Sequence, residues 1–564
     1  MPKGLKVNLV DPGVVTDAET KAPTGSEPAA FVAGAAPDPT STDTTPPPAT
    51  PTAPPSTVPE PPIVSRADWG ADESLSPDPS EYNADVKAVF VHHTDGAAYT
   101  CDQSASIVRG IYAFHTHAEP SGNGWNDIGY NFLVDKCGTV FEGRKGGVGL
   151  PVLGAHTYGW NRESTGIAVL GDYTSTSASS AALASVARVA AWKLGQYGAD
   201  PAGTVQLTTA ATQKNLSGAS FTAGGTYTFN RISGHRDGYA TECPGNSLYA
   251  QLPTIRSWAA GPVQGLKVAS VTGATLSGST YYAKGALTVK WTATTPGSLI
   301  KNFQLLVDGR TVATTPGTAT SASATVAAGK HTVAVRAVHQ SGKTTTTAAL
   351  NVTAETTAPT FTTTPKLALR GGTVNTAAVP VTLRWKATDD TALRSVQLLS
   401  PTTAAFGPTT TSSARTARSG TASTWSMRAD DYAGNSRTSS ASYTPVILQE
   451  SSAAKSGSWT TRSSSSYLGG KSYSSASKSA SLTWTFTGRS AAWVVSRAST
   501  SGQAYVYVDG TKVATVDLKS SATQYRQAIW TKTWSSSAKH TVKIVVVGTS
   551  GRPTITTDGL VYIK

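Results

Sequence analysis

The sequence has little cysteine, little charge and no long apolar run. Three cysteines in 564 residues are too few for a disulfide scaffold, but they suffice for one metal ligand and one bridge. No run of about 18 apolar residues occurs, so we expect no membrane-spanning segment. Met1 is not followed by the apolar segment of a signal peptide. We therefore expect that an export signal either lies upstream of residue 1 or has been removed.

Charged residues make up only 14% of the chain, yet the formal net charge is +13. A basic surface suits nucleic acid or an anionic polymer of the cell wall. The sequence contains no nucleic-acid recognition motif and no cluster of Lys and Arg. This argues against nucleic acid as a partner and favours a diffuse attraction to anionic wall glycans.

The composition changes along the chain and predicts five parts. Residues 1–60 are rich in Pro, Thr and Ala, and they predict a disordered linker because they cannot bury enough apolar surface to offset the entropy of ordering. Residues 61–262 have the mixed periodicity of an α/β domain. Short alternating segments then predict all-β sandwich domains at 263–355 and 356–447 and a further β domain at 448–564.

Within 61–262 the patterns predict a central mixed sheet with helices packed on it. Runs of apolar and β-branched residues predict strands, and apolar residues near helical spacing predict helices. The expected strands are 86–91, 130–134, 139–142 and 166–170, and the expected helices are 104–115 and 181–197.

Two segments beyond residue 262 resemble each other. Leu287–Trp291 and Val381–Trp385 share the same alternation, and each is followed by a second strand pattern. This spacing predicts two sandwich domains in tandem. Asp389-Asp390 and Ala429–Asn435 are similar to the corner loops of bacterial immunoglobulin-like modules.

The residues with the clearest chemistry lie in the loop Gly234–Gly245. His235 and Cys243 are eight residues apart, and imidazole and thiolate are good ligands for a borderline-soft ion such as Zn²⁺. One His and one Cys make only half of a metal site. The best candidate for a third ligand is His92, at the end of an apolar strand pattern, with His93 as second choice.

Three motifs occur in the order typical of one family: FVHHT at Phe90–Thr94, DIGYNFLVD at Asp127–Asp135 and GHRDGYATECPG at Gly234–Gly245. With these motifs, residues 61–262 resemble the zinc-dependent N-acetylmuramoyl-L-alanine amidases of the peptidoglycan recognition protein type. The resemblance implies an α/β amidase domain that binds Zn²⁺ through His92, His235 and Cys243. A zinc ion with one open position polarises a carbonyl and lowers the pKa of bound water to roughly 7.

The resemblance also implies roles around the metal. Tyr130 occupies the position whose phenol faces the zinc and hydrogen-bonds the tetrahedral intermediate, although a core Tyr is the alternative. Thr241 matches a position that carries Lys or Thr in relatives, with bracing of the loop as the alternative. Ala168 stands where cytosolic muropeptide amidases carry a catalytic Glu, which leaves no obvious general base.

Further residues of the same motifs are candidate substrate contacts: His93, His156, Asn161 and Arg236. His156 matches the segment that forms the floor of the family's groove. His115 and His117 are a rival metal pair, but at i and i+2 they point to different sides of a helix. We expect them instead to line the groove or to cap the end of the helix.

Cys101 and Cys137 remain once Cys243 is used as a ligand. They flank the predicted helix 104–115 and would close a loop of 36 residues, which by chain entropy stabilises a fold by roughly 3–4 kcal/mol. The alternative is two free thiols in a reducing compartment. Export favours the disulfide.

The last part of the chain carries Trp459, Trp484, Trp493 and Tyr525 in β-rich surroundings. This part resembles jelly-roll modules of secreted glycan-active enzymes. We expect most of these aromatic residues to be core, and stacking of an exposed ring on a sugar is the alternative.

Together these features predict a secreted or wall-associated hydrolase, with peptidoglycan as partner. It would cut the amide bond between N-acetylmuramic acid and L-alanine, and its β domains would tether it to the wall. We expect a monomer. The alternatives are a peptidoglycan receptor without activity and a wall-anchored adhesin that uses the β domains.

Overall fold

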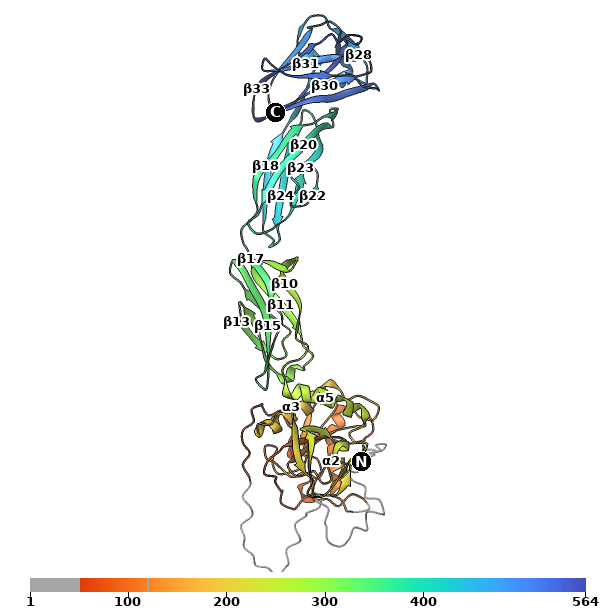
Figure 1. The fold of residues 1–564 in the computed structure, drawn as a ribbon, viewed down its shortest axis with the longest axis vertical. Coiled ribbons are helices and arrows are strands. Elements are labelled where there is room, and N and C mark those ends of the chain that lie inside the picture. Colours follow the sequence, from red (N-terminus) through yellow and green to blue (C-terminus); the bar gives the residue numbers. More distant parts are fainter. Residues whose placement is uncertain (1–50, 119–120) are drawn as a thin grey trace, which may run out of the picture. The chain divides into compact units, whose positions relative to one another are not determined.

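The computed structural model describes residues 51–118 and 121–564, and Figure 1 labels its helices and strands. Most of the predicted linker, residues 1–50, lies outside the described residues. The chain divides into two compact units, and the division passes through the strands between residues 267 and 354. In the described parts of the chain, no helix is long and apolar enough to cross a membrane.

A five-stranded sheet with the order β3-β2-β4-β1-β9 forms the centre of the first unit. The hairpin β2–β3 is antiparallel, and the other neighbours are parallel. All residues of β1 and β4 are buried, as expected for a sheet that is covered on both faces. The strands are β1 (Ala88–His93), β2 (Phe132–Val134), β3 (Val140–Glu142), β4 (Ser164–Val169) and β9 (Ile232–Gly234).

Helices cover the two faces of this sheet. One face contacts α3 (Ser180–Gln196) and α5 (Asn246–Ala260) through a single apolar core. The opposite face contacts α2 (Ser104–Thr116), and a hairpin of β5 (Thr204–Thr208) and β8 (Thr226–Asn230) covers the side of Ala88 and Phe90. The remaining short elements are α1 (Arg66–Trp69), η1 (Glu73–Leu75), η2 (Cys101–Gln103), β6 (Gln213–Lys214), β7 (Ser220–Phe221) and α4 (His235–Gly238).

The sequence patterns predicted this α/β fold closely. The helices expected at 104–115 and 181–197 are α2 and α3, and the expected hairpin is β2–β3. Ser179 caps α3, because its Oγ accepts the backbone N–H of Ala182 at 3.1 Å. Gly198 follows the end of α3 with a φ of 64°, a left-handed conformation that glycine adopts without strain.

Residues 51–60 differ from the prediction of a disordered linker. The Ser56 hydroxyl donates to Trp192 O at 2.7 Å, and Thr57 N donates to Gly195 O at 3.3 Å. Val58 is only 5% exposed and belongs to the core around α3. A Cβ at position 195 would lie 2.6 Å from Ser56 Oγ, so Gly195 gives this segment the space to lie against the helix.

Residues 267–354 are built of strands, with one short helix, η3 (Gly297–Leu299). In the first unit β12 pairs antiparallel with β13 and β15, and in the second unit β11 pairs parallel with β17. The strands are β10 (Lys267–Ser277), β11 (Thr280–Thr292), β12 (Ile300–Val307), β13 (Arg310–Pro316), β14 (Ser321–Thr325), β15 (Gly329–His339), β16 (Thr344–Thr346) and β17 (Leu350–Ala354).

The second sandwich lies wholly in the second unit. Its sheets have the orders β18-β20-β23 and β22-β21-β24-β25, and Trp385 and Trp425 are buried in their common core. The strands are β18 (Thr360–Leu369), β20 (Val379–Thr388), β21 (Leu393–Ser400), β22 (Ala404–Phe406), β23 (Ser412–Ala417), β24 (Ser423–Asp431) and β25 (Ser436–Tyr443).

The rest of the second unit is a sheet built on three long strands, β30 (Ser481–Arg497), β33 (Gln524–Val546) and β34 (Ile555–Ile563). Trp484 and Trp493 are buried in its core, whereas Tyr525 is 38% exposed. The chain beyond residue 262 is therefore predominantly β, as expected. The other elements are β19 (Gly372–Thr373), β26 (Pro445–Gln449), η4 (Glu450–Ser452), β27 (Ala454–Ser456), β28 (Thr460–Ser463), η5 (Leu468–Gly470), β29 (Lys471–Ser475), β31 (Gln503–Val508) and β32 (Thr511–Asp517).

The second sandwich and the last part of the chain share apolar core. Val494 and Val561 belong to the same buried cluster as Leu367 and Val381, and β19 pairs with β33. A buried cluster of this kind opens only when both sides lose their packing, so these two parts form one compact body.

Candidate metal centre

Two neighbouring parallel strands bring His92 and His235 together. His92 is near the end of β1, and His235 directly follows β9 as the first residue of α4. Because β1 and β9 are parallel, with Val91 opposite Gly234, the C-terminal ends of the two strands lie at the same edge of the sheet. The two imidazole rings have a centroid distance of 4.6 Å.

The loop after α4 returns Cys243 to the same place. Cys243 O accepts the backbone N–H of Arg236 at 3.0 Å, and Cys243 N donates to Thr241 Oγ1 at 3.2 Å. The thiol lies 3.7 Å from Nδ1 of His92. Potential ligand atoms of His92, His235 and Cys243 all lie within 4.8 Å of one another, and the three residues are buried.

The unused donor atoms of this cluster fit a metal ion. Among the described residues, neither ring nitrogen of His235 has a hydrogen-bond partner, although both are buried. On His92, Nε2 contacts His156 Nδ1 at 3.3 Å and Thr157 Oγ1 at 3.4 Å, so that Nδ1 faces Cys243. Buried polar atoms without partners are costly, and two imidazoles with one thiolate are a donor set that Zn²⁺ prefers.

Burial also sets the protonation of these groups. It lowers the pKa of His235 to about 3, so the ring is neutral at pH 7 and its lone pair is available to a metal. Burial raises the pKa of Cys243 to about 12 in the absence of a cation. A bound divalent cation reverses this effect on a coordinating thiol, so metal binding at this site would release a proton.

Tyr130 and Ala168 lie next to His92. The ring of Tyr130 is 5.3 Å from the ring of His92, and the Tyr130 side chain is buried. Ala168 is the direct neighbour of His92 in the register of β1 and β4. A carboxylate at position 168 would therefore lie beside His92, and in this chain a methyl group takes its place.

The residues expected to contact substrate are buried and have partners inside the protein. His93 Nδ1 accepts the backbone N–H of Tyr173 at 3.1 Å, and the backbone N–H of His93 donates to Cys243 Sγ at 3.4 Å. The Nδ1 atom of His93 is thus already used in a hydrogen bond within the protein. The ring of His92 instead lies with His235 and Cys243, which favours His92 as the candidate ligand.

His156 and Asn161 form the support of His92. Asn161 Oδ1 accepts the backbone N–H groups of His156 and Thr157, both at 2.8 Å, and these two residues contact Nε2 of His92. A Cβ at position 166 would lie 2.4 Å from the ring of His156, so Gly166 makes the room for this ring. His156 is therefore a partner of His92 in this structure, and its contact with substrate stays a prediction.

Arg236 and Thr241 shape the loop that carries the thiol. Arg236 Nη1 donates to Asn246 Oδ1 at 2.7 Å, and Nη2 donates to Glu242 O. With the hydrogen bond from Cys243 N to Thr241, these contacts fix the loop on both sides of the thiol. Both residues thus brace the loop, and a role of Arg236 in substrate binding or of Thr241 in catalysis stays a prediction.

The rival pair of histidines is not brought together as a metal site. His115 is buried and accepts the backbone N–H of Gly129 on Nδ1 at 3.1 Å. His117 follows the end of α2 and is exposed. The different environments agree with the expectation that the two side chains point to different sides of the helix.

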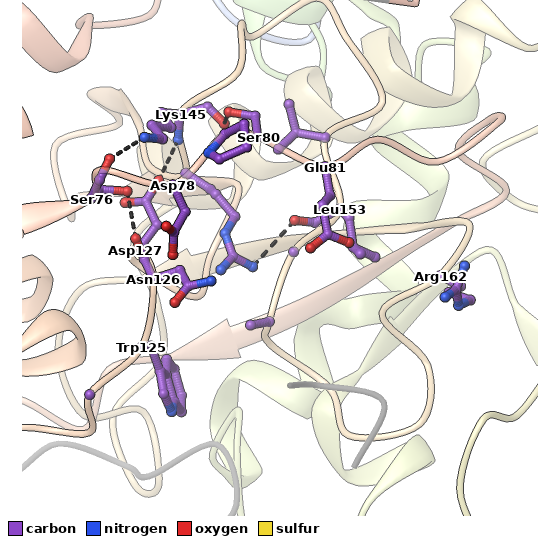
Figure 2. A pocket seen from close by; sticks show the side chains of 16 residues that line it. Ser76, Asp78, Ser80, Glu81, Trp125, Asn126, Asp127, Lys145, Leu153 and Arg162 are labelled. Carbon is purple, nitrogen blue, oxygen red and sulfur yellow. Dashed lines mark hydrogen bonds between the residues drawn. The ribbon is translucent and has the colours of Figure 1, made fainter. Parts of the chain in front are cut away.

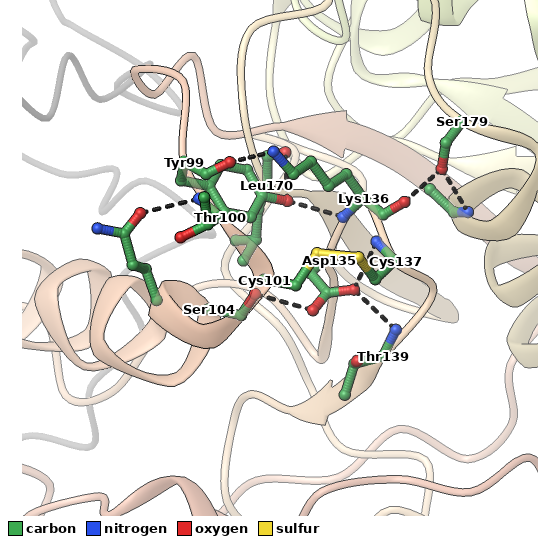
Figure 3. Close-up of a disulfide and its surroundings, with 12 residues drawn as sticks. Tyr99, Thr100, Cys101, Ser104, Asp135, Lys136, Cys137, Thr139, Leu170 and Ser179 are labelled. Carbon is green, nitrogen blue, oxygen red and sulfur yellow. Dashed lines mark hydrogen bonds between the residues drawn. A yellow bond between two sulfur atoms is a disulfide. The ribbon is translucent and has the colours of Figure 1, made fainter.

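A disulfide joins Cys101 to Cys137, as predicted, with a Cα–Cα distance of 6.3 Å. It links the start of η2 and α2 to the turn of the hairpin β2–β3 (Figure 3). The carboxylate of Asp135 accepts hydrogen bonds from Ser104 Oγ and from the backbone N–H groups of Cys137 and Thr139. The bridge therefore lies in a turn that is also held by hydrogen bonds.

The first unit also contains a pocket that is lined by side chains of both charges (Figure 2). The ring of Trp125 is tilted against the ring of His115 at a centroid distance of 4.6 Å, and the centroids of His115 and Tyr130 are 5.7 Å apart. Arg144 lies in the wall and donates to Leu153 O at 3.2 Å. The charged residues that line the pocket are Asp78, Glu81, Asp127, Arg144, Lys145 and Arg162.

The sequence patterns did not reveal this pocket. Its residues come from three connecting segments, between η1 and β1, between α2 and β2, and between β3 and β4. The one local signal is that polar residues gather between the predicted strands, and this is also true of ordinary surface loops.

Known proteins are similar to this part of the chain. A family model described as N-acetylmuramoyl-L-alanine amidase matches residues 82–246. Peptidoglycan-recognition protein SC2 of Drosophila simulans is 31% identical over 200 residues, which are 35% of this chain and 88% of that protein. N-acetylmuramoyl-L-alanine amidase of Homo sapiens is 29% identical over 201 residues, which are 35% of this chain and 28% of the human protein.

A solved structure, wild-type PGRP-LB of Drosophila, is 27% identical and covers 34% of this chain and 92% of its own, with a TM-score of 0.25. The residues matched by the family model include His92, His235 and Cys243, and the Drosophila simulans relative is matched over 88% of its length. The chain therefore belongs to the family of peptidoglycan-recognition proteins and N-acetylmuramoyl-L-alanine amidases.

Proposed function

We propose that this chain is a zinc-dependent amidase that hydrolyses the bond between N-acetylmuramic acid and L-alanine in peptidoglycan. The observation that carries the proposal is the buried cluster of His92, His235 and Cys243, in which both ring nitrogens of His235 lack a partner in the described structure. A receptor that only binds has no need of three converging soft ligands in its interior. The family model and the human relative named as an amidase support the same reaction.

The three residues would hold Zn²⁺, which when bound polarises the amide carbonyl and supplies a nucleophilic oxygen at neutral pH. His156 and Thr157 fix the ring of His92 so that its Nδ1 faces Cys243. Such supporting contacts orient metal ligands and raise their affinity. Thr241 and Arg236 hold the loop of Cys243 in the same way.

Tyr130 is the side chain of this site that we assign to the reaction itself. Its ring lies beside His92, on the face of the sheet that also carries Ala168. A phenol in this position donates a hydrogen bond to the oxygen that gains charge during amide hydrolysis. Since Ala168 supplies no carboxylate, the phenol is the protein's own polar group for this step.

The mixed-charge pocket would bind the peptide and glycan next to the scissile bond. Peptide stems carry both carboxylate and amino groups, and the pocket offers Arg144 and Lys145 together with Asp78 and Glu81. Trp125 offers an aromatic surface between the pocket and His115. The disulfide supports an extracytoplasmic location, and the β domains would tether the enzyme to anionic wall glycans through the net charge of +13.

The test measures zinc content and the release of new amino termini from purified peptidoglycan, with the wild-type chain and Cys243→Ser. We expect about one zinc per wild-type chain and release of L-alanine amino ends, and neither from the variant. The exposed His117 gives a matched control, because His117→Ala removes an imidazole outside the cluster and should keep both properties.

If the wild-type chain binds peptidoglycan but holds no zinc and releases no amino termini, the chain is a receptor, and the role assigned to Tyr130 is wrong. Tyr130→Phe separates the two roles of the site, because it should keep zinc and lose most of the activity.

A further inference from the structure

Three acidic side chains converge at one end of the second sandwich, far along the chain from the candidate zinc ligands. Glu355 directly follows β17, Asp389 directly follows β20, and Asp431 is the last residue of β24. One carboxylate oxygen from each lies within 4.8 Å of the others. All three residues belong to the second compact unit.

Hydrogen bonds hold the loops that carry these carboxylates. Asp389 Oδ1 accepts the backbone N–H groups of Thr391 and Ala392, at 3.0 and 2.9 Å. Asp431 accepts the backbone N–H and the side-chain amide of Asn435, at 2.7 and 2.9 Å. These contacts fix the positions of the Asp389 and Asp431 carboxylates. Neutral N–H groups carry no positive charge, so they do not neutralise the negative charge of the three acidic side chains.

The segment with Glu355 is held to the same loops. Asn435 Nδ2 also donates to Glu355 O at 3.1 Å, and Glu355 N donates to Ala283 O at 2.9 Å. The Glu355 side chain is therefore directed to the two aspartates by contacts on both sides of its own backbone.

Two oxygens of the cluster have no partner. Glu355 Oε1 and Asp389 Oδ2 are buried and make no hydrogen bond with any described residue. Glu355 is only 6% exposed and Asp431 is fully buried. In the described part of the chain, no Lys, Arg or His forms an ion pair with any of the three. Burial raises the pKa of Glu355, and the carboxylates of Asp389, Asp431 and Asp390 raise it further.

Buried carboxylates without a counter-charge are strongly destabilising, so such a cluster either takes up a proton or binds a cation. The converging groups are oxygen donors only, which are the ligands of hard cations rather than of zinc or copper. Ca²⁺ accepts irregular sets of carboxylates and completes its shell with water, whereas Mg²⁺ requires a nearly ideal octahedron.

We propose that Glu355, Asp389 and Asp431 bind one Ca²⁺ ion. The ion joins the segment after β17 to the β20–β21 and β24–β25 loops, so it orders the point at which the chain enters the second sandwich. This site is separate from the zinc cluster and does not depend on the proposed amidase activity.

The first test is a calorimetric titration of the full-length, zinc-loaded chain with CaCl₂ after removal of free divalent ions. We expect one saturable site with a Kd of roughly 0.1–1 mM, the range of extracellular calcium modules. Glu355→Gln and Asp431→Asn should each weaken binding at least about tenfold, since each removes one charged ligand. Asp390→Asn is the matched control, because it removes the same charge from an exposed neighbour and should bind like the wild type.

Thermal unfolding of the same proteins keeps the test valid if a variant folds poorly. Without Ca²⁺, Glu355→Gln should unfold at the same or a higher temperature than the wild type, because it removes a buried charge that lacks a partner. With 10 mM Ca²⁺ as the probe concentration, about ten times the weaker Kd expected above, the wild type should shift upward and Glu355→Gln should not. The proposal is overturned if the wild type shows neither binding nor a shift, or if Glu355→Gln binds as tightly as the wild type. Amidase activity should be the same in all four proteins, so a failure here is distinct from a failure of the proposed function.

Discussion

Removal of the Cys101–Cys137 bridge is the perturbation whose size follows most directly from the structure. The bridge closes a loop with a sequence separation of 36, and the loss of chain entropy in the unfolded state gives a stabilisation of about 4 kcal/mol. For a domain of about 200 residues, a loss of that size lowers the Tm by roughly 8–16 °C. Cys137 is exposed and Cys101 is half-buried, so replacement by Ser removes little packing and reports mainly on the cross-link.

The assay is thermal unfolding of the zinc-loaded wild type and of the double variant Cys101→Ser/Cys137→Ser, with and without dithiothreitol. We expect the reductant to lower the Tm of the wild type to that of the double variant and to leave the variant unchanged. The Asp135 hydrogen bonds remain in both proteins, so the turn should keep its native form at low temperature. The entropic reasoning is refuted if the double variant unfolds within about 2 °C of the wild type, which corresponds to less than about 1 kcal/mol.

Three further predictions concern the metal cluster. His156→Leu should weaken zinc binding by roughly 10–100-fold, as measured by competition with a chelator, because it removes a contact that orients His92. Thr241→Val should weaken zinc binding by about fivefold through the loss of one hydrogen bond to Cys243 N, whereas Thr241→Ser should not. Burial lowers the pKa of His235 and of His156 to about 3, so the unfolded chain binds more protons than the folded chain between pH 3 and the ordinary His pKa of about 6.5. The metal-free protein should therefore lose stability as the pH falls from 6.5 toward 3, and a urea midpoint that stays constant over this range would contradict the buried, neutral state of these rings.

The sequence predicted the parts of the site that depend on local pattern. The apolar run before His92 indicated a strand, and the family motifs placed His235 and Cys243 on a loop. In the structure β1 and β9 are parallel neighbours, which explains why residues 143 positions apart in the sequence, His92 and His235, meet at one sheet edge. The roles of these residues in zinc binding and catalysis stay predictions until zinc and activity are measured.

The supporting residues were harder to predict, because their roles depend on contacts between distant segments. His156 was expected in the segment of a groove floor, and the structure adds that its ring fills the space left by Gly166 and contacts His92. Ser56 was expected in a disordered linker, yet it lies against α3 where Gly195 lacks a side chain. In both cases a glycine in the partner element makes the contact possible, and a pattern of apolar spacing does not show which glycine has that function.

The carboxylate cluster of Glu355, Asp389 and Asp431 also depends on contacts between distant segments, so the sequence did not predict it. In the sequence, Asp389 and the loop that contains Asp431 were predicted only as corner loops of a sandwich, and no role was predicted for Glu355. Only the fold brings the three together and leaves two buried oxygens without partners. Because an unneutralised buried charge would destabilise the sandwich, the cluster needs either a proton or a cation, and the local sequence reveals neither. The proposed calcium site would thus order the entry of the second sandwich, whereas the candidate zinc ligands in the first unit are held by their own set of buried partners.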